Sequence, residues 1–337
     1  MSPEMEFVKY LGKGTYGSVD LFRYNKGDGS TFYTAVKISD HKSFDREFQI
    51  LSELKGCPRI VQVFGNSLIQ GTDSNGKEVY KMPMEYAAAG NLTSFIKRNK
   101  NLSDSMIKDF TRMILQGLVS IHSLGYVHCD LKPDNLLLFP RYDEESWNCS
   151  YDLKISDFGL SIKAGEDSDC WEIDSPFVGT PVYMSPESVD DGSVEKTLDL
   201  WSLGCIVLEM HTGKTPWVGV SINDLQEFLA EGKNVPEIPN TVPCDARQFI
   251  ETCFARKLED RGTASELLLH PFLIRETKGM LLRRRRRTPA KVEELTKKPS
   301  KLKVITSKSP EFKKIANKPR RIKILPPRPP ISSFVPV

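Results

Sequence analysis

A short polar stretch near the middle of the chain contains residue types suited to catalysis. His128-Cys-Asp-Leu-Lys-Pro-Asp-Asn135 brings an imidazole, two carboxylates, an amine and a carboxamide together within eight residues. The apolar run Leu136-Leu-Leu-Phe139 follows at once and predicts a strand. A polar cluster that leads into a strand is typical of a catalytic loop held by a rigid element. The alternative is an ordinary surface loop between a helix and a strand.

A glycine-rich segment near the N-terminus could bind phosphate. Gly12-Lys-Gly-Thr-Tyr-Gly-Ser-Val19 lies between two strand-like segments, Met5–Leu11 and Asp20–Tyr24. Glycine lets the backbone approach a ligand closely, so that amide groups can face phosphate oxygens. A glycine-rich hairpin or a dinucleotide-binding turn would give the same pattern. The dinucleotide interpretation requires a helix directly after the glycines, whereas Ser18–Phe22 is strand-like.

A lysine and a glutamate follow at positions that could form an ion pair. Lys37 lies near the end of a predicted strand, Thr31–Ile38, and a helical pattern covers Ser43–Leu54. Glu47 borders the apolar face of this helix, where an unpaired carboxylate would be costly. Lys37 is therefore its candidate partner, although a lysine on a strand is more often a solvated edge charge.

The elements around these residues form two groups. Predicted strands at Pro58–Leu68 and Glu78–Tyr86 complete a small five-stranded lobe with one helix, over about residues 5–86. A larger, mostly helical lobe follows, over about residues 87–274. The fold class is therefore α+β. Helices are predicted at Leu92–Lys97, Ser103–Leu124, Lys196–Met210, Ile222–Glu231, Asp245–Phe254 and Thr263–His270.

Two segments of the large lobe lack a clear period. Pro140–Ser150 is a polar insertion between the strand at 136–139 and a second predicted strand, Asp152–Ile155. Residues 160–178 are acidic and contain serine, which predicts a mobile loop.

Charge separates the last part of the chain from the rest. Residues 275–337 carry a net charge of +16 and residues 1–274 a net charge of −13. The last part is also rich in proline, so we expect a disordered basic tail. The seven cysteines are widely spaced and form no Cys-x-x-Cys pair. With no apolar run near about 18 residues and no signal pattern, the sequence predicts a soluble intracellular protein without a disulfide framework.

Six motifs in order resemble those of the eukaryotic protein kinases. They are the glycine loop, Ala35-Val-Lys37, Glu47, the His128–Asn135 stretch, Asp157-Phe-Gly159 and Ser185-Pro-Glu187. The resemblance covers roughly residues 5–274 and implies a bilobal kinase fold that uses ATP and Mg²⁺. Asp199 and Arg261 match structural residues of the family, and Arg261 is expected to pair with Glu187.

The resemblance also implies the role of each site residue. Asp130 would accept the proton of the substrate hydroxyl, and Lys132 would steady the transferred phosphate. Asn135 and Asp157 would hold Mg²⁺. Thr180 would contact Asp130 and Lys132. The adenine would lie against the hinge, defined as Glu85-Tyr-Ala87. The residues expected around ATP are Leu11, Gly12, Lys13, Gly14, Thr15, Tyr16, Gly17, Ser18, Val19, Lys37, Glu47, Met84, Glu85 and Ala87.

The substrate class follows from finer resemblance. Lys132 and Gly179-Thr-x-x-Tyr183 are similar to serine/threonine kinases. The segments Glu47–Pro58, His128–Pro133 and Gly179–Ser188 resemble plant MEKK-like mitogen-activated protein (MAP) kinase kinase kinases. This resemblance implies MAP kinase kinases as the protein substrates.

One position departs from the common kinase pattern in a way that concerns regulation. Cys129 stands where most kinases have the arginine that pairs with a phosphate on the activation loop, and a thiol cannot form this contact. The acidic loop at 160–178 would also repel a phosphate on Ser168 or Ser175. We therefore expect activity that does not require phosphorylation of this loop. Burial of Cys129 as a small apolar residue is favoured over a redox-sensitive thiol.

The tail contains two kinds of signal. Arg283–Arg287 is a run of five arginines that suits nuclear import, so the protein is expected in the cytoplasm, the nucleus or both. Specific nucleic-acid binding is the least supported alternative. Lys298–Ile305 and Lys318–Leu325 share a basic-then-apolar pattern that resembles docking peptides of MAP kinase pathways. The alternative is isolated apolar residues in a disordered tail.

Two other functions compete with a protein kinase. A pseudokinase scaffold would bind partners without turnover, but Lys37, Asp130, Asn135 and Asp157 are all present. A kinase for small molecules is disfavoured by Ser185-Pro-Glu187 and the helices after it.

Overall fold

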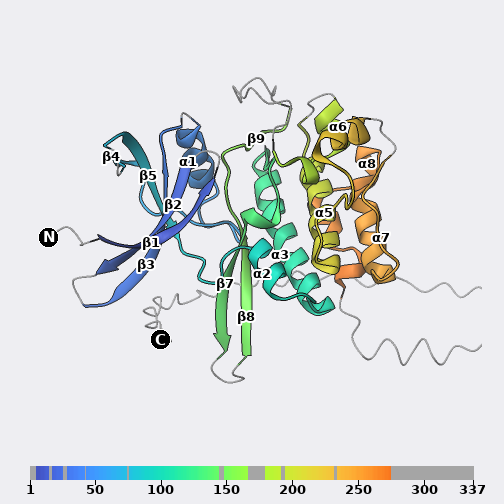
Figure 1. Ribbon diagram of the computed structural model, residues 1–337, viewed down its shortest axis with the longest axis horizontal. Coiled ribbons are helices and arrows are strands. Elements are labelled where there is room, and N and C mark those ends of the chain that lie inside the picture. The colour runs from blue at the N-terminus through green and yellow to red at the C-terminus, as the bar shows by residue number, and fades with distance from the viewer. Residues whose placement is uncertain are drawn as a thin grey trace, which may run out of the picture. The chain divides into compact units, whose positions relative to one another are not determined.

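The computed structural model describes residues 5–14, 17–25, 29–41, 43–73, 76–143, 148–165, 179–190, 194–230 and 234–274 (Figure 1). The predictions of a mobile loop and of a disordered basic tail therefore fall mostly or wholly outside the described residues. The same holds for Thr15 and Tyr16 of the glycine segment.

The small lobe is a five-stranded antiparallel sheet with one helix, as predicted. Its strands lie in the order β1-β2-β3-β5-β4, and helix α1 (Phe44–Glu53) follows β3. Val19 is paired with Lys37, and Leu21 with Ala35, so these side chains share one face of the sheet. The strand bounds are β1 Met5–Gly14, β2 Gly17–Asn25, β3 Thr31–Ser39, β4 Ile69–Thr72 and β5 Glu78–Glu85.

The predicted strand at Pro58–Leu68 is wrong. This segment is irregular and makes only isolated bridges, from Ile60 to Ile155 and from Val63 to Met84. Val61 N donates to Ile155 O, whereas Glu85 N donates to Gln62 O, so successive residues bond to different strands and no ladder forms. The apolar pattern reflects burial of this segment. The fourth strand of the sheet is instead the short β4, within the turn-rich region after it.

The large lobe is mostly helical, as predicted, and side chains that cap helices explain where several of them begin. Asn91, Ser103 and Thr263 each accept a hydrogen bond from a backbone amide in the first turn of α2, α3 and α9. Helix α5 is buried on nearly all sides, which is why its sequence is mostly apolar on every face. The helices are α2 Leu92–Arg98, α3 Asp104–Ser123, α4 Pro186–Asp190, α5 Thr197–Thr212, α6 Ile222–Ala230, α7 Cys244–Cys253, α8 Leu258–Arg261 and α9 Ala264–Leu267.

The predicted polar insertion at Pro140–Ser150 is largely a hairpin. Strand β7 (Leu136–Asp143) pairs with β8 (Asn148–Ile155) well beyond the apolar ends of both strands. Tyr142 is 70% exposed, so this part of the hairpin has no buried face that would produce an alternating pattern. In Figure 1 the hairpin projects from the helices of the large lobe.

Two further differences concern short elements. The last predicted helix ends early, at Leu267, and a 3-10 turn over Pro271–Leu273 follows. Proline disfavours helical geometry at the residue before it, which accounts for the break at His270. The two-residue strands β6 (Tyr126–Val127) and β9 (Ile162–Lys163) were not predicted and are too short for a periodic signal.

Within the described residues, no helix is both long and apolar enough to span a bilayer. The six cysteines in this part of the chain are free thiols.

Candidate active site

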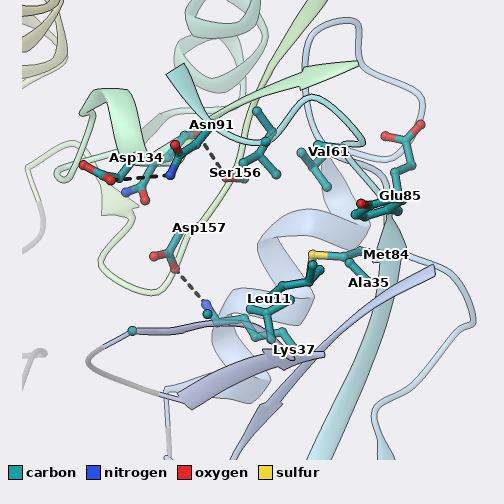
Figure 2. Close-up of a pocket in the computed structure, with 18 of the residues that line it drawn as sticks. Leu11, Ala35, Lys37, Val61, Met84, Glu85, Asn91, Asp134, Ser156 and Asp157 are labelled. Carbon is teal, nitrogen blue, oxygen red and sulfur yellow. Dashed lines mark hydrogen bonds and ion pairs between the residues drawn. The ribbon is translucent and has the colours of Figure 1, made fainter. Parts of the chain in front are cut away.

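A cavity of about 920 Å³ brings the predicted residues together (Figure 2). Of those that the structure describes, every one except Ser18 lines it. Ser18 is paired with Ile38 and precedes Val19, so it lies on the other face of β2. Sequence reasoning missed Ala35, Val61, Asn91, Ser94 and Leu137. Ala35 could have been found, because it lies two residues before Lys37 on one strand.

The glycine segment is the turn between β1 and β2, and its glycines differ in function. A Cβ on Gly17 would lie 2.2 Å from the backbone oxygen of Ile38, so no other residue fits there without a shift of the backbone. A Cβ on Gly12 or Gly14 would meet no described atom within 4 Å. Gly17 allows the close approach of β2 and β3, and all three glycines line the cavity.

Lys37 lies between two carboxylates at one end of the cavity. Its Nζ donates to both oxygens of Glu47 at 2.7 Å and to Oδ1 of Asp157 at 2.7 Å. Burial lowers the pKa of Lys37, but the charges of Glu47 and Asp157 outweigh this and raise it above the ordinary value. Lys37 is therefore a fixed cation at physiological pH, and the predicted pairing with Glu47 is confirmed.

Asp157 responds to the same cation. Burial raises the pKa of Asp157, but the charge and hydrogen bond of Lys37 have the larger effect and bring this pKa below its ordinary value. Glu47 is more deeply buried, and burial keeps its pKa above the ordinary value despite Lys37. Of the two carboxylates, Asp157 is thus the stronger anion, and 41% of its side-chain surface remains exposed.

Asp130, Lys132 and Thr180 form a closed set of hydrogen bonds. Lys132 Nζ donates to Asp130 Oδ2 and to Thr180 Oγ1, both at 2.7 Å, and Thr180 Oγ1 donates to Asp130 Oδ1 at 2.8 Å. Asn135 Nδ2 donates to the backbone oxygen of Asp130 at 2.8 Å and to its Oδ2 at 3.2 Å. The predicted contacts of Thr180 are confirmed. The arrangement holds a carboxylate beside an ammonium group in an open cavity, a geometry suited to proton acceptance next to a developing negative charge.

The buried carboxylate of Asp199 holds the start of the His128–Asn135 stretch in place. Asp199, on α5, accepts hydrogen bonds from His122 Nε2 at 2.8 Å, His128 N at 2.9 Å and Cys129 N at 3.2 Å. Cys129 has a φ of 66°, which is strained for a residue with a side chain. Asp199 therefore supports the strained turn that places Asp130.

Residues 179–187, called the activation segment below, approach the same turn at Gly179. A Cβ on Gly179, whose φ is 122°, would lie 2.9 Å from the backbone oxygen of Cys129. Arg261 is fully buried and donates to both oxygens of Glu187, at 2.5 and 2.9 Å, which confirms the predicted pair.

The thiol of Cys129 is not poised for reaction. Burial raises its pKa well above the ordinary value, and the negative charge of Asp199 raises it further. The expectation of a structural thiol is thus in accord with its surroundings.

The two predicted magnesium ligands, Asn135 and Asp157, both line the cavity and have suitable atoms. Asn135 uses its nitrogen in the hydrogen bonds above, which leaves the carboxamide oxygen for a cation. Asp157 contributes a carboxylate with a lowered pKa. Mg²⁺ commonly binds one or two protein oxygens together with substrate phosphates, so this donor set fits it. No larger group of His, Cys, Asp or Glu in the described residues is arranged to hold a metal.

Comparison with known proteins assigns the family. The family model for the protein kinase domain matches residues 5–273. Mitogen-activated protein kinase kinase kinase 20 of Arabidopsis thaliana is 33% identical over 283 residues, which cover 80% of this chain and 78% of the relative. Serine/threonine-protein kinase BCK1/SLK1/SSP31 of Saccharomyces cerevisiae is 38% identical over 273 residues, 78% of this chain but 18% of that relative. Mitogen-activated protein kinase kinase 2 of Arabidopsis thaliana is 32% identical over 287 residues, 80% of this chain and 72% of the relative. The chain therefore belongs to the protein kinase family.

Proposed function

We propose that this protein is an ATP-dependent serine/threonine kinase that acts as a MAP kinase kinase kinase. The observation that carries the proposal is the meeting of two networks at one cavity, Lys37–Glu47–Asp157 and Asp130–Lys132–Thr180. Phosphoryl transfer requires a positioned hydroxyl and neutralised phosphate charge rather than covalent catalysis, and these networks supply both.

In this proposal each end of the cavity has a separate task. The β1–β2 turn covers the phosphates of ATP, and Lys37, held by Glu47, contacts the α- and β-phosphates. Asn135 and Asp157 hold Mg²⁺, which when bound neutralises charge on the phosphate oxygens. Met84 and the hinge hold the adenine.

The residues of the second network act on the transferred group. A serine or threonine oxygen of the substrate attacks the γ-phosphorus as ADP leaves, and the proton of that hydroxyl passes to the carboxylate of Asp130. Lys132 steadies the moving phosphate. Thr180 fixes the orientation of the Asp130 carboxylate, because it binds the oxygen that Lys132 does not.

A cascade role is supported by the relatives and by the segments that resemble this class. The relatives include MAP kinase kinase kinases and also a MAP kinase kinase. We therefore propose a MAP kinase kinase as the substrate. Phosphorylation of a MAP kinase would instead indicate that the protein acts as a MAP kinase kinase.

The tail is proposed to recruit the substrate to the catalytic unit. In this proposal residues 5–274 form the kinase domain and residues 275–337 a basic tail, whose Lys298–Ile305 and Lys318–Leu325 dock on a pathway partner. Arg283–Arg287 is proposed to direct the protein to the nucleus as well as the cytoplasm.

The experiment is a parallel assay with kinase-inactive substrates. The full chain, with Mg²⁺ and ATP, is offered a MAP kinase kinase, a MAP kinase and a generic serine peptide, and the phosphorylated residues are mapped. We expect phosphate on serine or threonine of the MAP kinase kinase, and weaker transfer to it after deletion of 298–325 with unchanged turnover of the peptide. Phosphate transfer to the MAP kinase alone would contradict the role as a MAP kinase kinase kinase. If deletion of 298–325 weakened phosphorylation of the MAP kinase kinase and of the peptide equally, docking by the tail would be contradicted.

A further inference from the structure

An ion pair joins the large lobe to the hinge at the edge of the cavity, through a lysine that does not line it. Lys154, on β8, donates to Oε1 and Oε2 of Glu85 at 2.6 and 2.7 Å. Its Nζ also lies 5.0 Å from the centre of the Phe139 ring. Both charged side chains are about three-quarters buried, with 21% and 26% exposed. The two-oxygen contact and the partial burial distinguish this pair from solvated surface pairs, which contribute little.

Glu85 is held by more than the lysine. Gln62 N donates to its Oε2 at 2.9 Å, and Glu85 N donates to Gln62 O at 3.0 Å. Thr34 Oγ1 donates to the neighbouring Met84 O at 2.9 Å. In Figure 2 the carboxylate of Glu85 lies at the far side of the cavity from Lys37 and Asp157 and points outward. The side chain of Glu85 thus serves to fix the hinge backbone, which lines the cavity.

Strand β8 ends at Ile155, and the next two residues, Ser156 and Asp157, line the other end of the cavity. Ser156 donates from both its N and its Oγ to Asn135 O, each at 2.9 Å, and Asp157 follows directly. Only two residues, Ile155 and Ser156, therefore separate Lys154, which holds the hinge, from Asp157, one of the proposed metal ligands. Because this connection is so short and Ser156 is fixed to Asn135 by two hydrogen bonds, a shift at Lys154 would be transmitted both to the hinge and to the proposed metal ligands.

A neighbouring ion pair on β8 serves as a contrast. Asp152 lies two residues before Lys154, on the same side of the strand, and pairs with Arg59 and with Arg141. Neither arginine lines the cavity. Arg141 is 66% exposed, and its contact with Asp152 is 3.4 Å long.

We propose that Lys154 is a positioning residue for nucleotide binding, which sets the hinge relative to Asn135 and Asp157 through its ion pair with Glu85. The inference rests on the proposed function, in which the hinge holds the adenine. It assigns to Lys154 an effect on nucleotide affinity, although its side chain does not line the cavity.

The test compares Lys154→Met, Glu85→Lys and the exchanged pair Lys154→Glu/Glu85→Lys with wild type. Methionine keeps the length and apolar packing of the lysine stem against Phe139, so this variant is expected to fold. The readouts are the calorimetric Kd for ATP with Mg²⁺, KM for ATP against kcat, and Tm. We expect each single variant to raise the Kd and KM for ATP about fivefold, and Lys154→Met to keep kcat within about twofold of wild type. The exchanged pair re-forms the ion pair and should bind ATP more tightly than either single variant, but not as tightly as wild type, because a lysine at position 85 cannot accept the hydrogen bond from Gln62 N. The matched control Arg141→Gln should leave the Kd unchanged.

The outcomes separate this inference from the function on which it rests. If Lys154→Met binds ATP as tightly as wild type does, the inference is overturned and the proposed function stays intact. A loss of Tm without a change in the Kd would show a purely structural ion pair and would also overturn it. Wild type that binds no ATP would overturn both.

Discussion

At the scale of single residues, Glu47 decides whether the phosphate end of the cavity is assembled. It is 3% exposed and accepts two hydrogen bonds from Lys37. Without its charge, Lys37 would have Asp157 as its remaining described carboxylate partner, and would compete with the cation that Asp157 is proposed to hold.

We therefore predict that Glu47→Gln lowers kcat/KM for ATP about 100-fold, because the amide cannot hold an ammonium group in place by charge. Steady-state kinetics with a serine peptide measure this effect. Asp45→Asn, an exposed position on the same helix, is the matched control and should stay within about twofold of wild type. Equal activity of Glu47→Gln and wild type would contradict the role of the pair.

Cys129 provides a second residue-level prediction. Burial and the charge of Asp199 raise its pKa, so the reactive thiolate is scarce at pH 8. Iodoacetamide should modify the exposed Cys149 and Cys244 at least about tenfold faster than Cys129, as followed by peptide mass spectrometry. Preferential labelling of Cys129 in folded protein would show that it is reactive after all.

Site residues were predictable where a local pattern restricts them. Glu47 could be paired with Lys37 because a carboxylate beside a buried helix face needs a cation. Lys154 and Glu85 are 69 positions apart and neither interrupts a local pattern, so only the folded chain reveals their contact.

At the scale of elements, a buried pair joins the activation segment to α5. Tyr183 OH donates to Glu209 Oε2 at 2.6 Å, and the two residues are each 6% exposed. Burial raises the pKa of Glu209, and the hydrogen bond from Tyr183 lowers it in part. The pKa of Tyr183 is also raised by burial, so its hydroxyl remains a donor throughout the physiological range.

This pair makes stability depend on pH in a defined direction. Because the folded-state pKa of Glu209 lies above its ordinary value of 4.5, its contribution to stability is largest below that value and is lost as the pH rises through the folded pKa. Tyr183→Phe removes the hydrogen bond that Glu209 accepts and therefore raises the pKa of Glu209 further. We predict that the variant loses about 2 kcal/mol of unfolding free energy at pH 8, and progressively less as the pH falls toward 4.5. Urea unfolding at several pH values measures the difference, and a loss that is the same at every pH would contradict it.

Helices and strands could be predicted where their buried residues recur at the regular spacing of a helix or a strand. Four of the five strands of the small lobe and the long helices α3 and α5 were predicted on this basis. The segment 58–68 was misassigned because its apolar residues are buried without a strand partner. The inner parts of β7 and β8 were predicted, whereas the outer part of this hairpin was missed because it is solvated on both faces.

At the scale of the whole molecule, ion pairs and hydrogen bonds hold both halves of the site in place. Lys37 contacts Glu47 and Asp157, while Thr180 contacts Asp130 and Lys132. Cys129 provides no cationic partner for a phosphate, and Asp199 and Gly179 hold its turn instead.

We therefore predict that protein made in bacteria and treated with phosphatase keeps at least about half of its activity on a serine peptide, and that Ser168→Ala/Ser175→Ala does so too. Intact-mass spectrometry establishes that the protein carries no phosphate. An inactive product that recovers only after phosphorylation of the 166–178 segment would contradict this prediction.

The central claim is that Asp130 accepts the proton of the substrate hydroxyl in a site that binds ATP independently of it. The most direct test is single-turnover phosphoryl transfer by Asp130→Asn, measured beside its Kd for ATP with Mg²⁺. Asparagine keeps the shape of the side chain but cannot take up the proton, so we predict a rate at least about 100-fold lower than wild type with the Kd within about threefold. Transfer at the wild-type rate by this variant would contradict the account.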